Sequence, residues 1–455
     1  MDKKAIQNSP IGGQGALTII GGGMTGLASA YIAAKQGVKV TVVEGSDKFG
    51  GLLNTFEIGG NQLEHYYHHF FTQDAELRWL LEDLKISDKA FYKKTTMGVF
   101  RNGKIYDFNT PIDLLKFKPV GLIGKARFGF TSLFLGKMAK WRENEGVSTL
   151  DWFYRWAGKD ITDALWKPML NIKFGPYANK VPLAWMIGRM AQRLNSRKGG
   201  DERLGYINGS WKTLMDVLMK RLQEMGVELI KNEPLEEFKI TNGKVEGIIT
   251  KNLTIDGGKF LLTIPSLYFN KIKNCPLDAN GVEYFGAVCT ILELKKSFSH
   301  IYWMNVADEG YPFGGVIEHT NFIPKEEYNG SHIVYLSRYF AMSEALATMS
   351  EDEIKAVMIP PLKKINPEFS EDWIKNVYVF KTNTAATVCD LNFSEKVTPC
   401  KTSTENLYLA NMVHIYPDER STNNSIRVAA EACKVMGINA DFVPFGASLS
   451  AQIGF

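Results

Sequence analysis

The sequence predicts an α/β fold with a parallel sheet, because strands and helices alternate at both ends of the chain. The apolar run Leu17–Ile20 is typical of a short buried strand, and helix-forming residues follow from Thr25 to Gln36. The β-branched stretch Val38–Val43 predicts a second strand. Near the other end, Leu407–Ala410 and Asn424–Met436 predict a further strand and helix. A strand–helix–strand start of this kind favours parallel pairing.

The length of 455 residues exceeds the size at which one hydrophobic core usually stops growing, so two domains are expected. No repeat or low-complexity linker divides the chain, which favours a second domain inserted into the first. The composition, 45% hydrophobic and 22% charged, is that of an ordinary soluble protein, and a net charge of +4 excludes few partners. The five cysteines form no C-x-x-C pair, which favours a reducing, cytoplasmic location. Neither a signal peptide nor an apolar stretch of roughly 18–20 residues that could span a membrane is expected.

Between the two ends the periodicity predicts several further elements. The segment from 110 to 200 is rich in helix-forming residues. Asn-Gly pairs at 102–103 and 242–243 predict the turns of two hairpins. Further helices are expected over 75–85, 211–225 and 351–365, and strands over 228–230, 237–240, 284–293 and 331–336.

The turn between the first strand and the first helix matches G-x-G-x-x-G over Gly21–Gly26. Its first glycine permits a sharp turn, its second lets the backbone approach a pyrophosphate, and its third lets the helix pack closely on the strand. The helix start offers free N–H groups to phosphates. Glu44, 18 residues beyond Gly26, ends the second strand, where an acid binds ribose hydroxyls and repels a 2′-phosphate. The turn residues expected to contact a dinucleotide are Gly21, Gly23, Met24, Thr25 and Gly26.

A second glycine pair, Gly50–Gly51, follows Glu44 closely and indicates another approach of the backbone to a large cofactor. An NAD enzyme does not need this pair. The pattern resembles the first motif of the flavin amine oxidase superfamily, which includes monoamine oxidases, protoporphyrinogen oxidase, phytoene desaturases and UDP-galactopyranose mutase. Leu52 stands where that motif usually has arginine. The resemblance implies that FAD is the cofactor and that Gly50, Gly51 and Leu52 contact it.

The resemblance returns in the middle and near the end of the chain. Residues 209–214 and 226–235 are similar to a segment in which a backbone group, here that of Leu235, meets the adenine. Residues 406–411 and 416–420 are similar to the C-terminal flavin motif, whose helix points its N-terminus at the flavin ring. The residues expected to hold the ring are Asn423, Asn424 and Ile426.

The resemblance implies a Rossmann-like FAD-binding domain with a parallel sheet, plus an inserted α+β substrate domain. The FAD-binding domain is expected to comprise 1–95, 205–280 and 390–455, and the substrate domain 96–204 and 281–389. The implied activity is transfer of a hydride from a substrate C–H bond to flavin N5, as in protoporphyrinogen oxidase and amine oxidases. Two alternatives stay open: a non-redox flavoenzyme acting on a nucleotide or lipid-linked sugar, as in UDP-galactopyranose mutase, and a non-catalytic flavin-binding protein.

The segment 64–72 contains three of the seven histidines among aromatic residues. It is interpreted either as a core strand with inert histidines or as a loop that faces the flavin. Zinc binding is not expected, because adjacent side chains point apart and no carboxylate or cysteine joins them at ligand spacing. The aromatic–histidine–aromatic pattern is similar to a segment of UDP-galactopyranose mutase beside the flavin. On that similarity His69 and Tyr66 are the candidate catalytic residues, and Phe71 faces the substrate.

Arg189, Arg193 and Arg197 recur every four residues, so a helix would present them on one face. They either grip an anionic substrate or are solvated. Arg338 and Tyr339 follow a strand and are interpreted as lining the same substrate pocket. Lys173 is expected at the surface, although amine oxidases use a lysine that holds water at flavin N5.

The segment 114–142 carries seven basic residues and no acidic one. Phe130, Phe134, Met138 and Trp141 fall at near-helical spacing and predict an apolar stripe beside these charges. Three interpretations stay open: packing of the stripe on the core, peripheral contact with an anionic membrane, and binding of a diphosphate substrate. The expected partner is a small-molecule or lipid-linked substrate. No nucleic acid is expected, because the sequence contains no basic motif of a known nucleic-acid-binding family. The basic residues are Lys116, Lys118, Lys125, Arg127, Lys137, Lys140 and Arg142.

Overall fold

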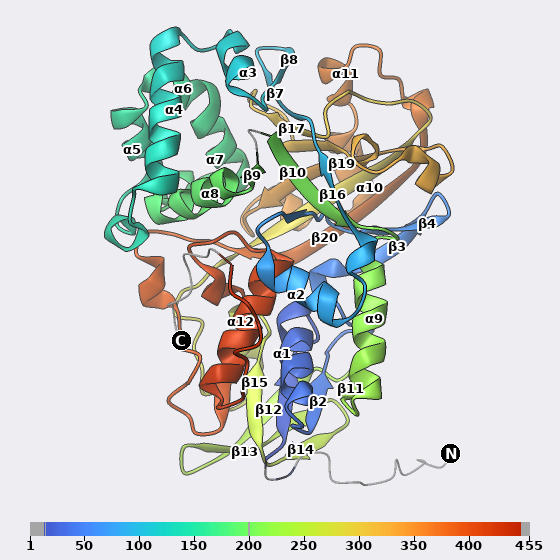
Figure 1. Cartoon of the computed structure of the whole chain (residues 1–455), viewed down its shortest axis with the longest axis vertical. Helices are drawn as coiled ribbons and strands as arrows, with labels where there is room; N and C mark the ends of the chain where they lie inside the picture. The colour runs from blue at the N-terminus through green and yellow to red at the C-terminus, as the bar shows by residue number, and fades with distance from the viewer. Residues whose placement is uncertain (1–12, 14, 199–200, 447–455) are drawn as a thin grey trace.

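The computed structural model describes residues 13, 15–198 and 201–446. Figure 1 shows two regions, a lower one built on a parallel sheet and an upper one with a larger mixed sheet beside a cluster of helices. The fold is therefore the predicted Rossmann-like α/β fold joined to an α+β region. How the chain divides into domains stays a prediction.

The parallel sheet has five strands that come from three distant parts of the sequence. Every neighbouring pair in it is parallel. The strands in spatial order are β11 (Glu228–Ile230), β2 (Val40–Val43), β1 (Leu17–Ile20), β15 (Lys259–Leu262) and β21 (Leu407–Leu409). The predicted strand–helix–strand start is confirmed by β1, α1 (Met24–Lys35) and β2.

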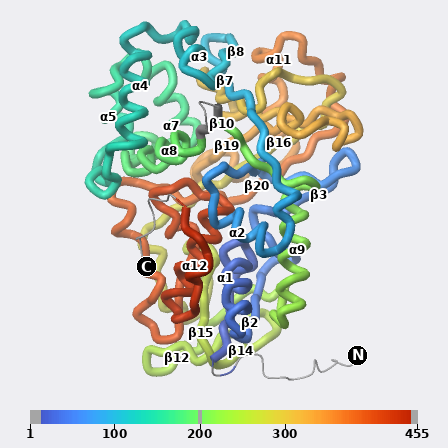
Figure 2. Tube along the Cα trace, viewed as in Figure 1, coloured from blue at the N-terminus to red at the C-terminus, as the bar shows by residue number. Residues whose placement is uncertain are grey.

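Alternate residues of this sheet belong to two different cores. Leu17 and Ile19 pack with the helices α1, α9 (Trp211–Glu224) and α12 (Thr422–Val435). Ile20 packs with a meander on the opposite face. That meander consists of β12 (Leu235–Thr241), β13 (Lys244–Thr250) and β14 (Thr254–Asp256). Figure 2 shows α1 and α12 side by side, although they lie at opposite ends of the chain.

The upper region contains a seven-stranded sheet that is antiparallel except for the parallel pair β17 and β7. Its strands in order are β20 (Ile374–Thr387), β16 (Tyr284–Leu294), β19 (His332–Phe340), β18 (Gly315–Glu318), β17 (Trp303–Val306), β7 (Met97–Arg101) and β8 (Lys104–Asp107). The predicted turn between β7 and β8 is confirmed, with Asn102 at φ 52° and Gly103 at φ 69°.

Smaller sheets and helices complete the molecule. The small strands are β3 (Thr55–Ile58), β4 (Asn61–Glu64), β5 (Phe70–Phe71), β6 (Ala90–Lys94), β9 (Arg197–Lys198) and β10 (Asp201–Ile207). The remaining α-helices are α2 (Ala75–Asp83), α3 (Pro111–Lys116), α4 (Leu122–Lys137), α5 (Thr149–Trp156), α6 (Lys159–Ile161), α7 (Lys167–Phe174), α8 (Leu183–Asn195), α10 (Glu351–Met358) and α11 (Leu362–Ile365). Within the described residues no helix combines the length and apolar character needed to cross a bilayer.

Three predictions about local structure were wrong. The single helix expected over 351–365 is two helices, α10 and α11, because Pro360 and Pro361 between them have no N–H to donate. Arg197 lies in β9 and does not continue the arginine face of α8. The apolar stripe expected in 114–142 is divided, since Trp141 is buried while Phe130 and Met138 are 69% and 73% exposed.

Candidate active site and cofactor cavity

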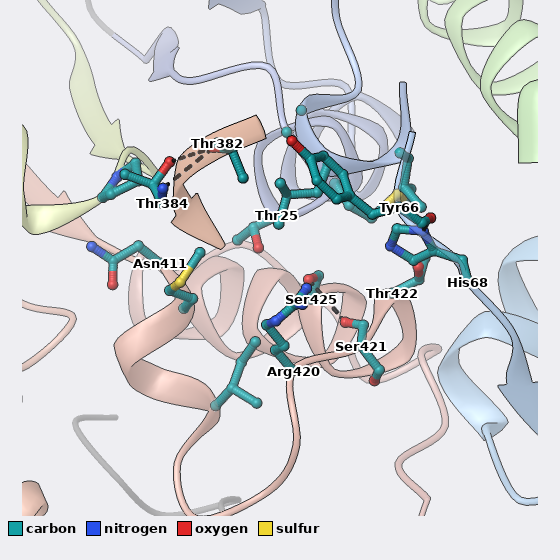
Figure 3. Close-up of a pocket in the computed structure, with 18 of the residues that line it drawn as sticks. Thr25, Tyr66, His68, Thr382, Thr384, Asn411, Arg420, Ser421, Thr422 and Ser425 are labelled. Atoms are coloured by element: carbon teal, nitrogen blue, oxygen red, sulfur yellow. Dashed lines mark hydrogen bonds between the residues drawn. The ribbon is translucent and has the colours of Figure 1, made fainter. Parts of the chain in front are cut away.

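A cavity of about 940 Å³ lies where the two regions meet. It begins at the turn that follows β1, and continues between α12, α8 and the large sheet. The carboxyl ends of parallel strands are the usual position for a ligand in such a fold. Figure 3 shows part of its lining, contributed by the first helix, the 66–68 segment, β20 and the start of α12.

The glycines of the turn have two different roles. Two of them allow close packing of the backbone, and one leaves open space beside the turn. A Cβ on Gly21 would lie 2.5 Å from Thr263 Oγ1, and one on Gly26 would lie 2.0 Å from the Gly21 carbonyl oxygen. A Cβ on Gly23 would meet no atom within 4 Å. Helix α1 begins after Gly23 with no side-chain cap and no acid in its first turn, so its N–H groups are available to an anion. The predicted turn contacts all line the cavity.

Glu44 is held in place at the carboxyl end of β2. Its Oε2 accepts the Gly22 N–H at 2.7 Å, and its Oε1 accepts the Ser46 N–H at 2.8 Å. The second glycine pair packs on the glycine turn, because Gly50 N–H donates to the Gly22 carbonyl at 2.8 Å. These contacts bring two segments expected to touch one cofactor into direct contact. The other predicted cofactor residues on this wall, Gly50, Gly51, Leu52 and Leu235, also line the cavity.

The start of α12 reaches the cavity as expected, but with other side chains. Asn423 Oδ1 accepts the Leu77 N–H at 3.0 Å, Asn424 Nδ2 donates to the Glu419 carbonyl at 2.7 Å, and Ile426 is fully buried. None of these three predicted ring contacts lines the cavity. Because Ile426 must face the core, the helix turns its other face to the cavity. The residues there are Ser421, Thr422 and Ser425.

The histidine-containing segment 64–72 packs against aromatic side chains and also lines the cavity. His65 stacks on Phe380 with ring centroids 3.9 Å apart. His69 contacts the edges of Phe71 and Trp303, at centroid distances of 5.5 and 5.7 Å. The predicted His69, Tyr66 and Phe71 therefore come together on one wall. No cluster of three metal-ligating side chains occurs among the residues described.

Burial and nearby cations keep these histidines neutral. Burial, followed by the charge of Arg193, lowers the pKa of His69 to about 3. Burial and then Arg420 lower the pKa of His68 to about 4. At neutral pH each ring therefore has one N–H donor and one acceptor nitrogen.

Five cationic side chains line the upper part of the cavity. Arg189 and Arg193 come from α8 and Arg338 from β19; these three predicted substrate residues line the cavity, and their role stays a prediction. The sequence did not identify the other two, Lys173 of α7 and Arg420 before α12. The expectation that Lys173 lies at the surface was wrong, because the helical cluster buries most of its side chain.

Most of these cations have carboxylate partners. Glu419 pairs with Lys173 Nζ at 2.5 Å and with Arg189 Nη1 at 3.1 Å. Burial opposes ionisation of Glu419, but the two cations outweigh it and lower its pKa to about 2. Burial lowers the pKa of Lys173 to about 8. The other pairs are Arg193 with Glu202 at 2.8 Å and Arg338 with Glu344 at 2.7 Å.

Arg420 differs from the other four cations. Its Nη2 donates to the Tyr339 hydroxyl at 2.5 Å, and no carboxylate of the described residues forms an ion pair with it. Of the three carboxylates that pair with the other cations, Glu419 lines the cavity, whereas Glu202 and Glu344 do not. A buried guanidinium with a neutral partner favours an anionic ligand. The sequence signal for Arg420 was its place in Tyr416–Arg420, directly before the C-terminal helix.

Comparisons with known proteins agree with this architecture. Residues 19–84 match the family model of the NAD(P)-binding Rossmann-like domain. The chain is 25% identical over 344 residues to mitochondrial protoporphyrinogen oxidase of Nicotiana tabacum, covering 69% of this chain and 63% of that one. It is 35% identical over 264 residues to 1-hydroxycarotenoid 3,4-desaturase of Flavobacterium sp. (strain P99-3), covering 52% and 54%. Both relatives are matched over less than two thirds of their own length.

Solved structures share the fold over nearly the whole chain. Reduced UDP-galactopyranose mutase superposes with a TM-score of 0.74 at 13% identity, covering 97% of each chain. Wild-type putrescine oxidase superposes with a TM-score of 0.71 at 16% identity, covering 93% of this chain and 99% of that one.

The glycine turn, its acid and the cavity beyond them define a dinucleotide-binding protein of the Rossmann-like class. More particularly, the chain is similar in sequence to a protoporphyrinogen oxidase and a carotenoid desaturase, and it shares its fold with members of the flavin amine oxidase superfamily. The cofactor of that superfamily is FAD, and the residues present fit it. The open space at Gly23 and the uncapped start of α1 suit a pyrophosphate, and the fixed Glu44 carboxylate suits a ribose. The cavity continues from there to the start of α12.

Proposed function

We propose that this chain is an FAD-dependent oxidoreductase that removes a hydride from a C–H bond of a substrate carrying an anionic group. The observation that carries the proposal is a single cavity that joins the glycine turn to a chamber lined by five cations. Bound FAD would supply the hydride acceptor at its N5 position. The named functions of the oxidase and desaturase relatives support an oxidoreductase.

The lower half of the cavity would hold the cofactor. The glycine turn and the start of α1 would bind the pyrophosphate, Glu44 the ribose, and the backbone near Leu235 the adenine. Thr422 and Ser425 face the cavity at the first turn of α12, where the helix dipole favours negative charge. That helix start would stabilise charge on the ring.

The upper half would hold the substrate. Neutral His69 and Tyr66 can hydrogen-bond substrate hydroxyl groups or water without adding charge. Arg420, Arg189 and Arg193 would bind the anionic group, and the proximity of several cations would compensate the loss of its hydration. Phe71 and Trp303 provide apolar surface for the rest of the substrate.

Anaerobic stopped-flow mixing tests this reaction. Carboxylated porphyrinogens, nucleotide sugars, amines and polyprenoids are mixed in turn with oxidised, FAD-loaded protein. Rapid bleaching of the flavin absorbance by an anionic compound is the expected result. Bleaching by amines or neutral polyprenoids alone would contradict the anionic substrate, and bleaching by no compound would contradict hydride transfer.

The second candidate is a non-redox mutase acting on a nucleotide or lipid-linked sugar. The cation-lined chamber favours it specifically, because a diphosphate suits several converging arginines. The same samples distinguish the two functions, since turnover of a nucleotide sugar only after dithionite reduction would identify the mutase. A flavin-binding protein without catalysis would show neither response.

A further inference from the structure

Helices α3 and α4 carry an exposed apolar surface, here called the α3–α4 surface. Twelve large apolar side chains are strongly exposed among the described residues, and seven of them belong to this short segment. Their exposed fractions range from 58% to 75%. Figure 1 shows α3 and α4 together at the top left, at the edge of the helical cluster and away from the parallel sheet. The seven residues are Ile112, Leu115, Leu122, Ile123, Phe130, Leu133 and Met138.

The outward direction of these side chains is fixed by the packing of α4. Its buried face includes Gly124, Thr131 and Leu135, and a Cβ on Gly124 would lie 2.3 Å from Asp160 Oδ2. A Cβ on Gly136 would lie 2.4 Å from Leu194 Cδ1 and 3.1 Å from the Met190 carbonyl oxygen. Rotating α4 to bury its exposed apolar residues would replace these glycines by larger side chains against α6 and α8. The helix is therefore held with Leu122, Ile123, Phe130 and Leu133 in solvent.

Aromatic side chains extend the surface onto α5. Phe130 stacks on Phe134 at 6.5 Å between centroids, and Phe134 stacks on Trp152 at 6.1 Å. Trp156 follows at 6.5 Å from Trp152 and is 52% exposed. Exposed aromatic residues beside an apolar face are typical of segments that lie at the boundary between lipid headgroups and acyl chains.

Basic residues border the same surface. Lys116 ends α3 and Lys118 follows it, Arg127 and Lys137 belong to α4, and Lys140 follows α4. All five residues are exposed. The buried Lys125 donates instead to the Leu115 carbonyl at 2.7 Å, which ties α4 to α3. No acidic residue occurs from Leu114 to Arg142.

We propose that the α3–α4 surface docks the protein peripherally on an anionic membrane. The apolar side chains would enter the headgroup and acyl-chain boundary, and the basic residues would pair with lipid phosphates. A second copy of this chain fits less well, because a symmetric contact would bring two positively charged surfaces together. The proposal rests on exposed residues outside the cavity, so it is independent of the reaction.

Vesicle sedimentation with the full chain tests the docking surface. Vesicles of phosphatidylcholine with phosphatidylglycerol are compared with vesicles of phosphatidylcholine alone. We expect binding to the anionic vesicles that weakens as salt is raised, and little binding to the neutral ones. The combined variant Ile123→Ser, Phe130→Ser and Met138→Ser should bind about tenfold more weakly or worse, because three apolar contacts with lipid are lost.

Two further variants separate docking from folding. Val357→Ser on α10 removes an exposed apolar residue elsewhere, and its vesicle binding should equal that of the unchanged chain. Arg127→Glu with Lys137→Glu reverses two charges but keeps the exposed apolar residues, and it should also weaken binding to anionic vesicles. Thermal unfolding of each variant checks its fold. The proposal is overturned if the unchanged chain ignores anionic vesicles, or if both surface variants bind normally. A third outcome would also overturn it. In that outcome, light scattering shows that the unchanged chain is a dimer and the combined serine variant is a monomer, and the variant still binds lipid.

Discussion

At the scale of single residues, Glu44 connects the fold to the cofactor, because its carboxylate already accepts the Gly22 and Ser46 N–H groups. The Glu44→Gln variant should bind FAD about tenfold to a hundredfold more weakly, since a charged acceptor for ribose hydroxyls is lost. Quenching of FAD fluorescence on titration of FAD-free protein measures this. Asp47→Asn, an exposed acid three residues later, is the matched control. Equal affinity in the two variants would contradict the role of Glu44.

The buried carboxyl group of Glu64 should make the stability of the folded chain depend on pH. Its buried carboxylate accepts the Trp211 N–H at 2.8 Å and the Tyr206 hydroxyl at 2.7 Å. Burial raises its pKa from 4.5 to about 7. Between these values the folded chain holds a proton that the unfolded chain has lost, so this contribution to stability is present below pH 4.5 and disappears as the pH rises through 7.

The Glu64→Gln variant isolates that contribution, because all other titrating groups are shared. The stability of the unchanged chain relative to the variant should fall by roughly 3 kcal/mol as the pH rises across that interval. Urea unfolding of both chains at a series of pH values measures the difference. A difference that is constant with pH would show that Glu64 ionises normally in the folded state.

At the scale of elements, the strand–turn–helix start predicts opposite effects for two glycines. Gly23→Ala should leave the FAD-free protein stable, because the new Cβ meets no atom within 4 Å and φ is −74°. It should weaken FAD binding about tenfold or more, since the methyl group occupies the space for the pyrophosphate. Gly26→Ala should destabilise the FAD-free protein by about 1–3 kcal/mol, because its Cβ would overlap the Gly21 carbonyl.

Urea unfolding without FAD and FAD titration together measure the two effects. A stable Gly23→Ala variant with normal FAD affinity would contradict the assignment of this turn to the cofactor. A Gly26→Ala variant as stable as the unchanged chain would contradict the close packing of α1 on its strand.

The sequence predicted those helices, strands and turns that depend on residues close together in the chain. The first strand–helix–strand unit and the hairpin at Asn102–Gly103 follow from periodicity and turn chemistry within a few residues. The edge strand β20 was not predicted, because it carries lysine, asparagine and threonine residues beside its apolar ones and its pairing partner β16 is far away in sequence. The rotation of α12 was also missed, since the choice between Asn424 and Ser425 depends on which face the core takes.

At the scale of the whole molecule, the chamber is formed by segments that meet only in the folded chain. Lys173 comes from α7, Arg189 from α8, Arg338 from β19 and Arg420 from the loop before α12. The sequence suggested the arginines of α8 from their spacing, but nothing local shows that they converge with Arg420. Long-range packing of the helical cluster against the large sheet creates this site.

Substitution of Arg420 tests whether these cationic side chains together bind an anion. Inorganic pyrophosphate should perturb the flavin absorbance of the FAD-loaded protein if the chamber accepts anions. Arg420→Gln should weaken this binding about tenfold or more, because a charge-assisted hydrogen bond is lost. Arg78→Gln, an exposed arginine on α2 outside the cavity, should bind like the unchanged chain. Equal weakening in both variants would show that the effect is only one of overall charge.

The central claim is that the glycine turn and the cavity beyond it hold FAD. Isothermal titration of FAD into FAD-free protein tests it most directly, with the absorbance spectrum of the gently purified chain as a companion. We predict a yellow protein that takes up one FAD per chain with high affinity, and clearly weaker uptake by Gly23→Ala. A colourless protein that stays colourless with added FAD and releases no heat of binding would contradict the account.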